Sequence, residues 1–306
     1  MNDPINQTKL FGLNNYFNEL KYLFDNNKLP NKILLSGPKG SGKFTLSLHL
    51  INYILSKNED YSYDVQNLQI NDKNKSFKLV KNNTSPNFYL IDIKKEKKNI
   101  EVDQIRELIS FCNKSSFNDK PRFVLIDNHE LMNLNSNNAL LKTLEEPNDN
   151  IIFIIINNSS KILQTIKSRC LYFKITLSHQ ESINIFNKII NKDIDSLINN
   201  DLISHYFTPG DLLNLYNFSF EKNIDLSKMK LEEFLLEIID NHYYKKDTLS
   251  INLIFAFLQM YFIKKINNLD NYSVYTKFVN SIDDIKRFNL DIESLFIRLR
   301  HQIIND

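Results

Sequence analysis

Short apolar runs alternate with helical patterns through the first half of the chain. The apolar runs are interpreted as strands and cover residues 32–36, 87–93, 122–127, 151–156 and 171–175. Apolar residues at helical spacing predict helices over residues 44–57, 101–111 and 135–146, and Pro147 should end the last of them. Near-continuous apolar strands that alternate with helices are typical of a parallel sheet covered on both faces. The first half is therefore predicted to be an α/β domain.

Helical periodicity replaces the strand signals after about residue 176. The helical patterns cover residues 182–192, 231–244, 250–266 and 292–304. We therefore expect an all-helical second half, with a division near residues 218–225. The polar stretch at residues 57–86 fits neither pattern and is interpreted as a loop or an irregular insertion.

The length and composition are those of an ordinary soluble protein. A chain of 306 residues is longer than one compact core usually needs, so two or three domains are expected. Hydrophobic residues make up 42% of the chain and charged residues 24%. The formal charge of +2 gives no overall attraction to nucleic acid, so any such binding depends on a local arrangement. The basic run at residues 94–98 is interpreted as a solvated loop.

Cysteine content and hydropathy indicate the compartment. Two cysteines, Cys112 and Cys170, are too few for a four-cysteine zinc module and give no disulfide framework. No charged-then-apolar signal segment opens the sequence. The most apolar run, residues 251–263, is shorter than a membrane span and contains Asn252 and Gln259. We expect a cytoplasmic protein that makes no contact with a membrane.

A glycine-rich turn follows the first predicted strand and precedes a long helix. It reads GPKGSGK, with glycines at Gly37, Gly40 and Gly42 and a lysine at Lys43. Glycines let backbone N–H groups converge on phosphate oxygens, and the helix N-terminus adds a favourable dipole. The lysine of such a loop reaches the outer phosphates. The strand–turn–helix context favours a phosphate-binding loop over a turn that binds nothing.

Two positions of this site lack the groups that hydrolysis requires. The residue after the lysine should carry a hydroxyl for Mg²⁺, but it is Phe44, and Thr45 lies about 100° further round the helix. Asp127 follows an apolar strand as a metal-binding acid should, but Asn128 follows it, and an amide cannot take a proton from water. Glu130 comes too late to be assumed equivalent. We therefore expect no hydrolysis by this chain and at most weak ATP binding.

Several segments together resemble one family. They are GPKGSGKFTL, IEVDQIRELISFC, FVLIDNHELMNLNSNNALLKTLEEP and TIKSRC, in this order and spacing. They are similar to the clamp loader of bacterial DNA polymerase III, and above all to its delta-prime subunit, a member of the AAA+ group. The similarity covers most of residues 10–175, and the combination of NALLKTLEEP with SRC is its most specific part.

The resemblance implies a fold in three parts. It implies a P-loop AAA+ parallel-sheet domain at residues 1–175, a small helical lid at 176–220 and an all-helical collar domain for oligomerisation at 221–306. The segment TPGDLL, residues 208–213, lies where relatives carry a glycine-containing turn near a basic sensor residue, and it contains no basic residue. Some relatives carry a zinc module in the first domain, and residues 57–86 occupy its place, so no zinc is expected.

The resemblance also assigns roles to single residues. Arg169 of SRC corresponds to an arginine that projects into the ATP site of a neighbouring subunit, where a guanidinium stabilises charge on the transferred phosphate. The alternative is a surface arginine paired with a nearby acid. Asn157 and Asn158 follow the fourth strand, where the family senses the γ-phosphate. Glu145 and Glu146 are interpreted as helix-end charges because adjacent helix residues do not face each other.

The start of the helix at residues 135–146 is a candidate contact for DNA. Free N–H groups and the short side chains of Asn135, Ser136, Asn137 and Asn138 suit a DNA phosphate without reading bases. Capping of the helix is the simpler role, and both can hold at once.

Three functions are compared. The favoured one is a non-hydrolysing delta-prime-type subunit that requires no cofactor, donates Arg169 in trans and helps hold primed DNA. Its expected partners are the gamma/tau motor and delta subunits, with the sliding clamp contacted indirectly. The alternative is an active motor-type AAA+ ATPase in which Thr45 and Glu130 replace the missing groups. A small-molecule kinase has no support in the TLEEP and SRC segments.

Overall fold

The computed structural model describes residues 4–94, 97–145, 150–245, 251–265, 276–281, 284 and 292–305. The chain divides into two compact units, Met1–Glu181 and Ser182–Asp306. The first unit contains the sheet and the second unit is helical. The separate lid and collar expected within the second half stay a prediction.

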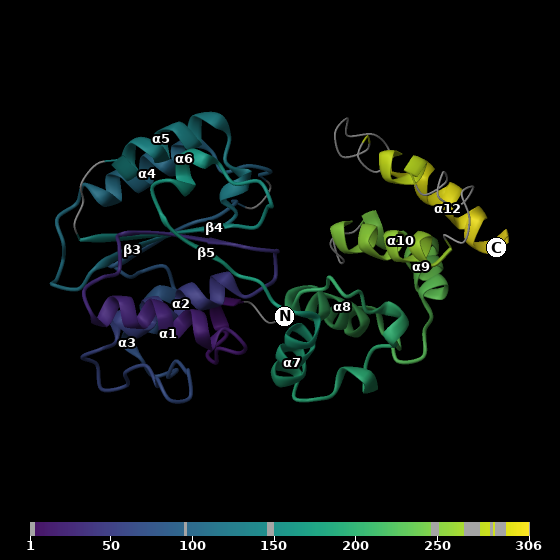
Figure 1. The fold of residues 1–306 in the computed structure, drawn as a ribbon, viewed down its shortest axis with the longest axis horizontal. Coiled ribbons are helices and arrows are strands. Elements are labelled where there is room, and N and C mark those ends of the chain that lie inside the picture. Colours follow the sequence, from purple (N-terminus) through teal and green to yellow (C-terminus); the bar gives the residue numbers. More distant parts are fainter. Residues whose placement is uncertain are drawn as a thin grey trace. The chain divides into compact units, whose positions relative to one another are not determined.

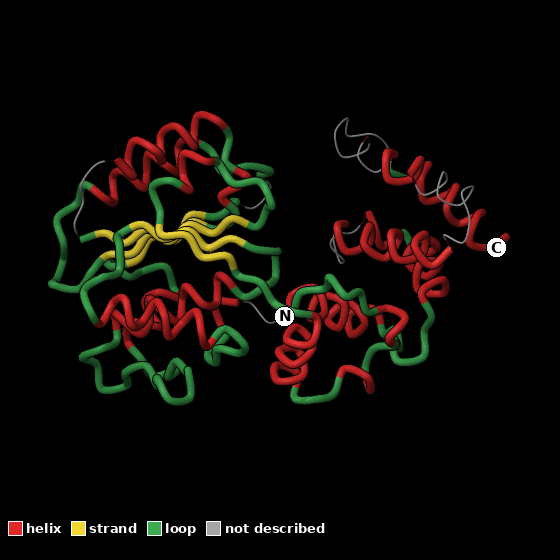
Figure 2. Tube along the Cα trace, viewed as in Figure 1, coloured by secondary structure: helices red, strands yellow, loops and turns green. Residues whose placement is uncertain are grey.

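The strands of the first unit form one parallel sheet in the order β2-β3-β4-β1-β5. They are β1 (Lys32–Ser36), β2 (Phe88–Ile91), β3 (Arg122–Ile126), β4 (Ile151–Asn157) and β5 (Leu171–Lys174). Figure 2 shows them as a single layer with helices above and below. Each apolar run of the sequence therefore forms a strand, and the α/β fold is confirmed. Because β1 lies between β4 and β5, the turn after β1 lies next to the end of β4.

Helices cover both faces of the sheet (Figure 1). One face carries α1 (Asn14–Asp25), α2 (Lys43–Leu55) and α3 (Lys75–Lys81), and the other carries α4 (Val102–Cys112), α5 (Leu134–Glu145) and α6 (Gln164–Lys167). Successive strand residues point to opposite faces, so Ile33 and Leu35 pack in the α1–α2 core while Leu34 packs in the α4–α5 core. Each apolar strand thus serves two cores. Short 3-10 helices lie at η1 (Pro4–Asn6) and η2 (His129–Leu131).

The interpretation of residues 57–86 as a loop is wrong in part, because α3 lies within it. Asn74 caps this helix by accepting the backbone N–H of Phe77 at 2.6 Å. Glu59 is anchored by Lys120, whose Nζ lies 3.0 Å from a Glu59 carboxylate oxygen. Ser76 of α3 donates its hydroxyl to the same carboxylate at 2.5 Å. These polar contacts fasten the segment to the sheet domain.

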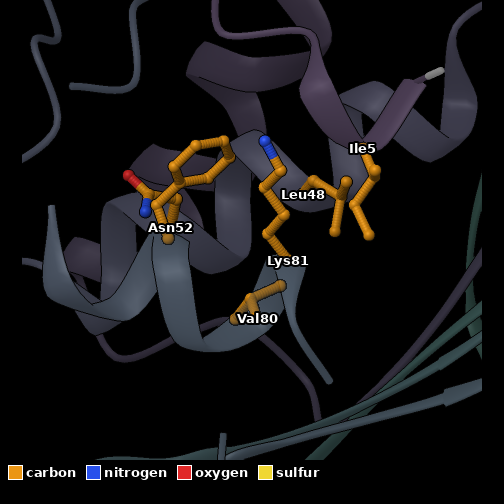
Figure 3. Close-up of a pocket in the computed structure, with 6 residues that line it drawn as sticks. Ile5, Leu48, Asn52, Val80 and Lys81 are labelled. Carbon is orange, nitrogen blue, oxygen red and sulfur yellow. The ribbon is translucent and has the colours of Figure 1, made fainter. Parts of the chain in front are cut away.

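A small apolar cavity lies between η1, α2 and α3 (Figure 3). Its volume is about 10 Å³, far below the several hundred Å³ of a ligand pocket. The residues that line it are Ile5, Leu48, Asn52, Phe77, Val80 and Lys81. The cavity is too small for a substrate, and we interpret it as a gap in the packing between α2 and α3.

The second unit consists of helices, as the periodicity predicts. They are α7 (His179–Ile190), α8 (Pro209–Lys222), α9 (Leu231–Asp240), α10 (Ile251–Lys265) and α12 (Glu293–Asn305), with 3-10 turns at η3 (Ile194–Ser196), η4 (Asn200–Leu202) and η5 (Tyr243–Lys245). Their apolar faces form one hydrophobic cluster, which includes Phe234, Phe257 and Phe296. None of the helices in the described residues is both long and apolar enough to cross a membrane.

The segment at residues 208–213 begins a helix that the sequence interpretation did not include. Thr208 accepts the backbone N–H of Asp211 at 3.2 Å, and the Asp211 carboxylate accepts the backbone N–H of Thr208 at 3.0 Å. This reciprocal capping box, with Pro209 at the first helical position, starts α8. The helix ends at Lys222, within the range 218–225 where a division of the second half was expected, and that division stays a prediction.

Candidate functional site

The glycine loop lies at the carboxyl end of β1 and leads directly into α2. The backbone N–H of Gly37 donates to the carbonyl of Asn157 at 3.2 Å, which ties the loop to the end of β4. Gly40 and Gly42 have φ of +82° and +87°, a conformation that glycine adopts without steric cost. A Cβ atom at Gly37 would lie 2.2 Å from the carbonyl oxygen of Ile175. The loop is therefore built closely against the sheet and requires glycine.

Lys43, the first residue of α2, is buried within this loop. Its Nζ atom donates to the carbonyl oxygens of Gly37 at 2.9 Å and Pro38 at 2.6 Å, and to the hydroxyl of Ser41 at 3.2 Å. An ammonium group has three N–H donors, so these three contacts use all of them. A phosphate would have to replace some of these contacts.

Burial also changes the ionisation of Lys43. Removal from water lowers its pKa to about 8, and the negative charges of Asp127 and Glu130 oppose that shift. All three groups therefore lie within electrostatic reach of one another. The structure brings the predicted lysine and aspartate together, as the phosphate-loop interpretation requires.

Phe44 and Thr45 occupy the first turn of α2. The Phe44 side chain is half-buried and packs against the hydrophobic cluster on the α1–α2 face. Thr45 is half-buried as well. The position that should offer a hydroxyl to Mg²⁺ is thus part of the apolar packing.

Polar side chains link the carboxyl ends of β2, β3 and β4. Asn128, whose φ of 52° is left-handed, donates its backbone N–H to Asp127 at 2.8 Å. Its side chain donates to Asp92 at 2.7 Å and accepts from the amide of Asn158 at 3.1 Å. Burial and then the neighbouring charge of Asp92 raise the pKa of Asp127 to about 6. Asp127 thus gives up its proton less readily than an exposed carboxyl group.

Glu130 lies closer to the site than its sequence position suggests. Its carboxylate accepts the backbone N–H of Asn158 at 2.9 Å. Its negative charge favours the protonated form of Lys43 and so raises the pKa of that lysine. The left-handed Asn128 and the 3-10 helix η2 turn the chain back toward β4 and carry Glu130 there. Spacing counted along the sequence could not show this, because it assumes an extended chain.

Asn157, the last residue of β4, is buried. Its amide donates to the carbonyl of Ser159 at 2.6 Å, within the loop that follows the strand. In this structure its side-chain N–H group is therefore engaged in local support of that loop. A phosphate-sensing role for Asn157 stays a prediction.

The start of α5 differs in detail from the expectation. Asn133 caps the helix by accepting the backbone N–H of Ser136 at 2.8 Å, and it also accepts the Ser136 hydroxyl at 3.0 Å. Ser136 is fully buried, and the buried amide of Asn137 donates to the carbonyl of Met132 at 3.1 Å. Asn135 is exposed. Asn133 therefore caps the helix instead of the predicted residues, and Asn135 and Asn138 are the two of the four predicted DNA-contact residues that are exposed.

Arg169 follows α6 and is exposed at the surface. One terminal nitrogen donates to the carbonyl of Thr165 at 2.9 Å, and the other donates to the carboxylate of Glu145 at 2.6 Å. The pairing with a nearby acid, which the sequence left open, is thus present. Glu146 and Pro147 lie outside the described residues. The role of Arg169 in a neighbouring subunit stays a prediction.

Neither cysteine forms a disulfide. Burial raises the pKa of the Cys170 thiol to about 11, so it stays protonated near neutral pH and is unsuited to act as a nucleophile. In the described part of the chain, His, Cys, Asp and Glu side chains form no group of three or more that could hold a metal ion.

A family model described as "DNA polymerase III, delta subunit" matches residues 12–179, more than half of the chain. The delta′ subunit of DNA polymerase III from Pseudomonas aeruginosa is 34% identical over 138 residues, which cover 45% of this chain and 40% of that protein. The gamma subunit from Buchnera aphidicola subsp. Schizaphis graminum is 32% identical over 170 residues, which cover 55% of this chain and 44% of that protein. The chain thus spans less than half the length of these two relatives.

A solved structure shows the same fold over nearly the whole chain. It is a DNA polymerase III gamma subunit-related protein from Thermotoga maritima, with 18% identity and a TM-score of 0.54. The superposition covers 93% of this chain and 98% of that protein. The fold expected from the sequence, a parallel-sheet α/β unit followed by helices, is therefore confirmed.

Proposed function

This chain belongs to the DNA polymerase III, delta subunit family, and we propose that it is the non-hydrolysing, delta-prime-type subunit of a sliding-clamp loader. Its similarity to a delta′ subunit and to gamma subunits supports a place among the clamp-loader subunits. In this role the chain is a stator: it offers a rigid α/β unit to its neighbours and turns over no ATP of its own.

The observation that carries this proposal is the packing of Phe44. The residue after the P-loop lysine lies in the hydrophobic cluster on the α1–α2 face, so no hydroxyl is available there for Mg²⁺. The metal bridges the outer phosphates and neutralises charge in phosphoryl transfer. Without a hydroxyl to hold Mg²⁺, the loop supports at most weak binding of ATP.

A second feature supports the same function. Asn128 stands after Asp127 and its amide is engaged by Asp92 and Asn158. An amide is not a base, and these contacts fix it at the ends of the strands. The groups for metal binding and for activation of water are thus both replaced.

Arg169 is the residue through which this subunit contributes to catalysis in the ATP site of a neighbouring subunit. The guanidinium is exposed, permanently charged and planar, which suits it to stabilise the charge on a γ-phosphate held by a neighbouring motor subunit. A subunit with a degenerate site of its own can keep this arginine because Arg169 is not part of the glycine loop. Arg169 follows α6, whereas the glycine loop precedes α2.

The partners follow from this role. The chain joins gamma/tau motor subunits and delta, contacts the clamp indirectly, and uses the start of α5 to hold the backbone of primed DNA. Asn135 and Asn138 are the exposed residues among the predicted contacts at that helix end. Contact with phosphate at this point carries no sequence information, as loading at any primed site requires.

An active, motor-type ATPase is the second candidate. The position of Glu130 favours it, because this carboxylate acts on Lys43 and lies at the end of β4. However, the carboxylate is occupied by the N–H of Asn158, and Thr45 is no substitute for the missing metal ligand at Phe44.

Turnover by the purified chain separates the two candidates. We expect Mg²⁺-ATP hydrolysis at the background rate, unchanged by Lys43→Ala, by Glu130→Gln or by the control Lys39→Ala in the same loop. Hydrolysis well above background that Lys43→Ala and Glu130→Gln abolish, and that Lys39→Ala leaves intact, would establish the motor-type ATPase instead.

A further inference from the structure

The contact between Arg169 and Glu145 joins two elements that are remote in sequence. Arg169 lies just after α6, and Glu145 is the last residue of α5, on the same face of the sheet (Figure 1). The guanidinium is held from two sides, by the carboxylate at 2.6 Å and by the carbonyl of Thr165 at 2.9 Å. The first contact is short and charge-assisted, so it is the stronger of the two.

These contacts leave most of the N–H donors of the Arg169 guanidinium available for further hydrogen bonds. An arginine side chain has five N–H donors, and the contacts with Glu145 and Thr165 use two of them. About one third of the Arg169 side chain is exposed, with a side-chain accessibility of 36%. The group is therefore held in place and still offers donors to an anion that approaches from outside.

The elements that hold the guanidinium are themselves fixed. Leu144, which precedes Glu145, is fully buried in the α4–α5 core, and so is Ile166 of α6. Cys170, which follows Arg169, packs half-buried against the same core. The two anchors thus connect a surface guanidinium to a rigid part of the domain.

We propose that Glu145 is a positioning residue, which orients Arg169 toward the phosphates of an ATP bound by the neighbouring subunit. This inference rests on the proposed function. A free arginine side chain has many rotamers, and ordering it at each turnover costs entropy. Prior ordering by Glu145 removes part of that cost from the transition state, where the position of a catalytic group matters most.

The negative charge of Glu145 also weakens the electrostatic attraction between the Arg169 guanidinium and a phosphate. The single bond from Glu145 lowers that attraction only modestly, because the pair is exposed, with side-chain accessibilities of 36% and 54%. Orientation therefore outweighs competition, and loss of the carboxylate slows the reaction.

The test is the ATPase of the clamp loader assembled with the full chain, stimulated by clamp and primed DNA. The variants are Glu145→Gln, Glu145→Asp, Arg169→Ala and the double variant Glu145→Gln/Arg169→Ala. Glu107→Gln is the matched control, because Glu107 is likewise an exposed helix glutamate in an ion pair, with Lys94 at 3.7 Å. Gel filtration shows that each complex is assembled.

We expect Glu145→Gln to lower kcat about threefold to tenfold with KM for ATP unchanged, since orientation acts in the transition state. Glu145→Asp should recover part of the rate, and Glu107→Gln should behave like the wild type. In the Arg169→Ala background, Glu145→Gln should have no further effect, because the carboxylate then has nothing to orient.

Other results overturn the inference in distinguishable ways. An unchanged or higher kcat for Glu145→Gln would show that Glu145 is neutral or restrains the arginine. An equal fall in both backgrounds would give Glu145 a role that does not pass through Arg169. If Arg169→Ala itself leaves turnover intact, the proposed arginine function fails, whatever Glu145 does.

Discussion

The Nζ atom of Lys43 lies 2.6 Å from the carbonyl oxygen of Pro38, a residue of its own loop. The lysine that should hold a nucleotide phosphate is therefore bonded internally and buried. Any nucleotide that binds has to compete with these contacts and gains no metal bridge at Phe44. These contacts are compatible with the proposal that this loop, despite the sequence of a phosphate-binding site, turns over no ATP.

The first prediction concerns the pH dependence of any ATP binding at this loop. Burial lowers the pKa of Lys43 to about 8, and only the ammonium form attracts phosphate. ATP affinity should be nearly constant below pH 7.5 and fall toward tenfold per pH unit above pH 8, as the lysine loses its proton. Titration of a fluorescent ATP analogue at pH 7 and pH 9 checks this.

The same titration has an internal control. Lys43→Ala should bind weakly at both pH values, and chelation of Mg²⁺ should change wild-type affinity by less than about threefold. Strong Mg²⁺ dependence in the wild type would mean that a metal ligand replaces Phe44 and would contradict the account of the site.

The second prediction concerns the glycine loop. Gly37→Ala brings a Cβ to 2.2 Å from the backbone oxygen of Ile175, so the loop or β5 must shift. We expect a loss of about 2–4 kcal/mol in the free energy of unfolding. Gly40→Ala, at an exposed residue with φ of +82°, should cost about 1 kcal/mol. Urea unfolding of both variants checks the order, and equal losses would show that the close approach of Gly37 is unimportant.

The fold follows from the sequence more completely than the site does. Strands such as residues 151–157 are buried at every position, so their apolar runs are unambiguous. The helix α3 was missed because it is short and lies in a polar stretch, where one capping residue, Asn74, was the available signal. A turn at TPGDLL was expected from the family resemblance, whereas Thr208 and Asp211 form a capping box that starts α8.

Within the site, the residue types were predictable but their orientations were not. Lys43 and Asp127 lie at the ends of predicted strands and turns, so their proximity follows from the topology. Ser136 faces inward because the helix starts at Leu134 with Asn133 as its cap, and sequence alone does not choose among several polar residues for a cap. Glu130 reaches the site through a left-handed residue, a conformation that apolar periodicity does not encode.

The third prediction concerns stability in acid. The His49 ring is buried, with Nδ1 2.8 Å from the Tyr63 hydroxyl and Nε2 3.0 Å from the carbonyl of Gln7. A carbonyl only accepts, so the neutral ring donates from Nε2 and accepts at Nδ1. Burial lowers the pKa of His49 to about 4, against about 6.5 in the unfolded chain.

The sign follows from the depressed pKa in the folded state. Between pH 6.5 and pH 4 the unfolded chain binds a proton that the folded chain does not, so the free energy of unfolding falls as the pH falls. The contribution of His49, about 1–3 kcal/mol, is present above pH 6.5 and lost toward pH 4. Urea unfolding gives the free energy of unfolding at pH 7.5 and at pH 5. The decrease in this free energy between the two pH values should be smaller for His49→Gln than for the wild type. His301 is exposed, so His301→Gln should show the same decrease as the wild type. An equal decrease in the wild type and both variants would contradict the depressed pKa of His49.

The fourth prediction concerns the anchor of residues 57–81. Lys120 donates to Glu59 at 3.0 Å and to the carbonyl of Leu55 at 2.6 Å. Because the Glu59 side chain is mostly buried, Lys120→Met should lower the free energy of unfolding by about 1–2 kcal/mol and expose the segment to proteolysis. Lys57→Met is the control, since that lysine pairs at 3.4 Å with Asp25 and is more exposed. Equal losses in the two variants would show that Glu59 is no anchor.

Whether Arg169 acts in a neighbouring subunit is decided by ATP hydrolysis of the reconstituted clamp loader, stimulated by clamp and primed DNA. The wild-type chain is compared with Arg169→Ala, with assembly checked by gel filtration. We expect a fall in turnover of at least about tenfold with assembly intact, because the arginine acts on ATP held by a neighbour. Unchanged turnover in the assembled complex would contradict the account and leave this chain a scaffold alone.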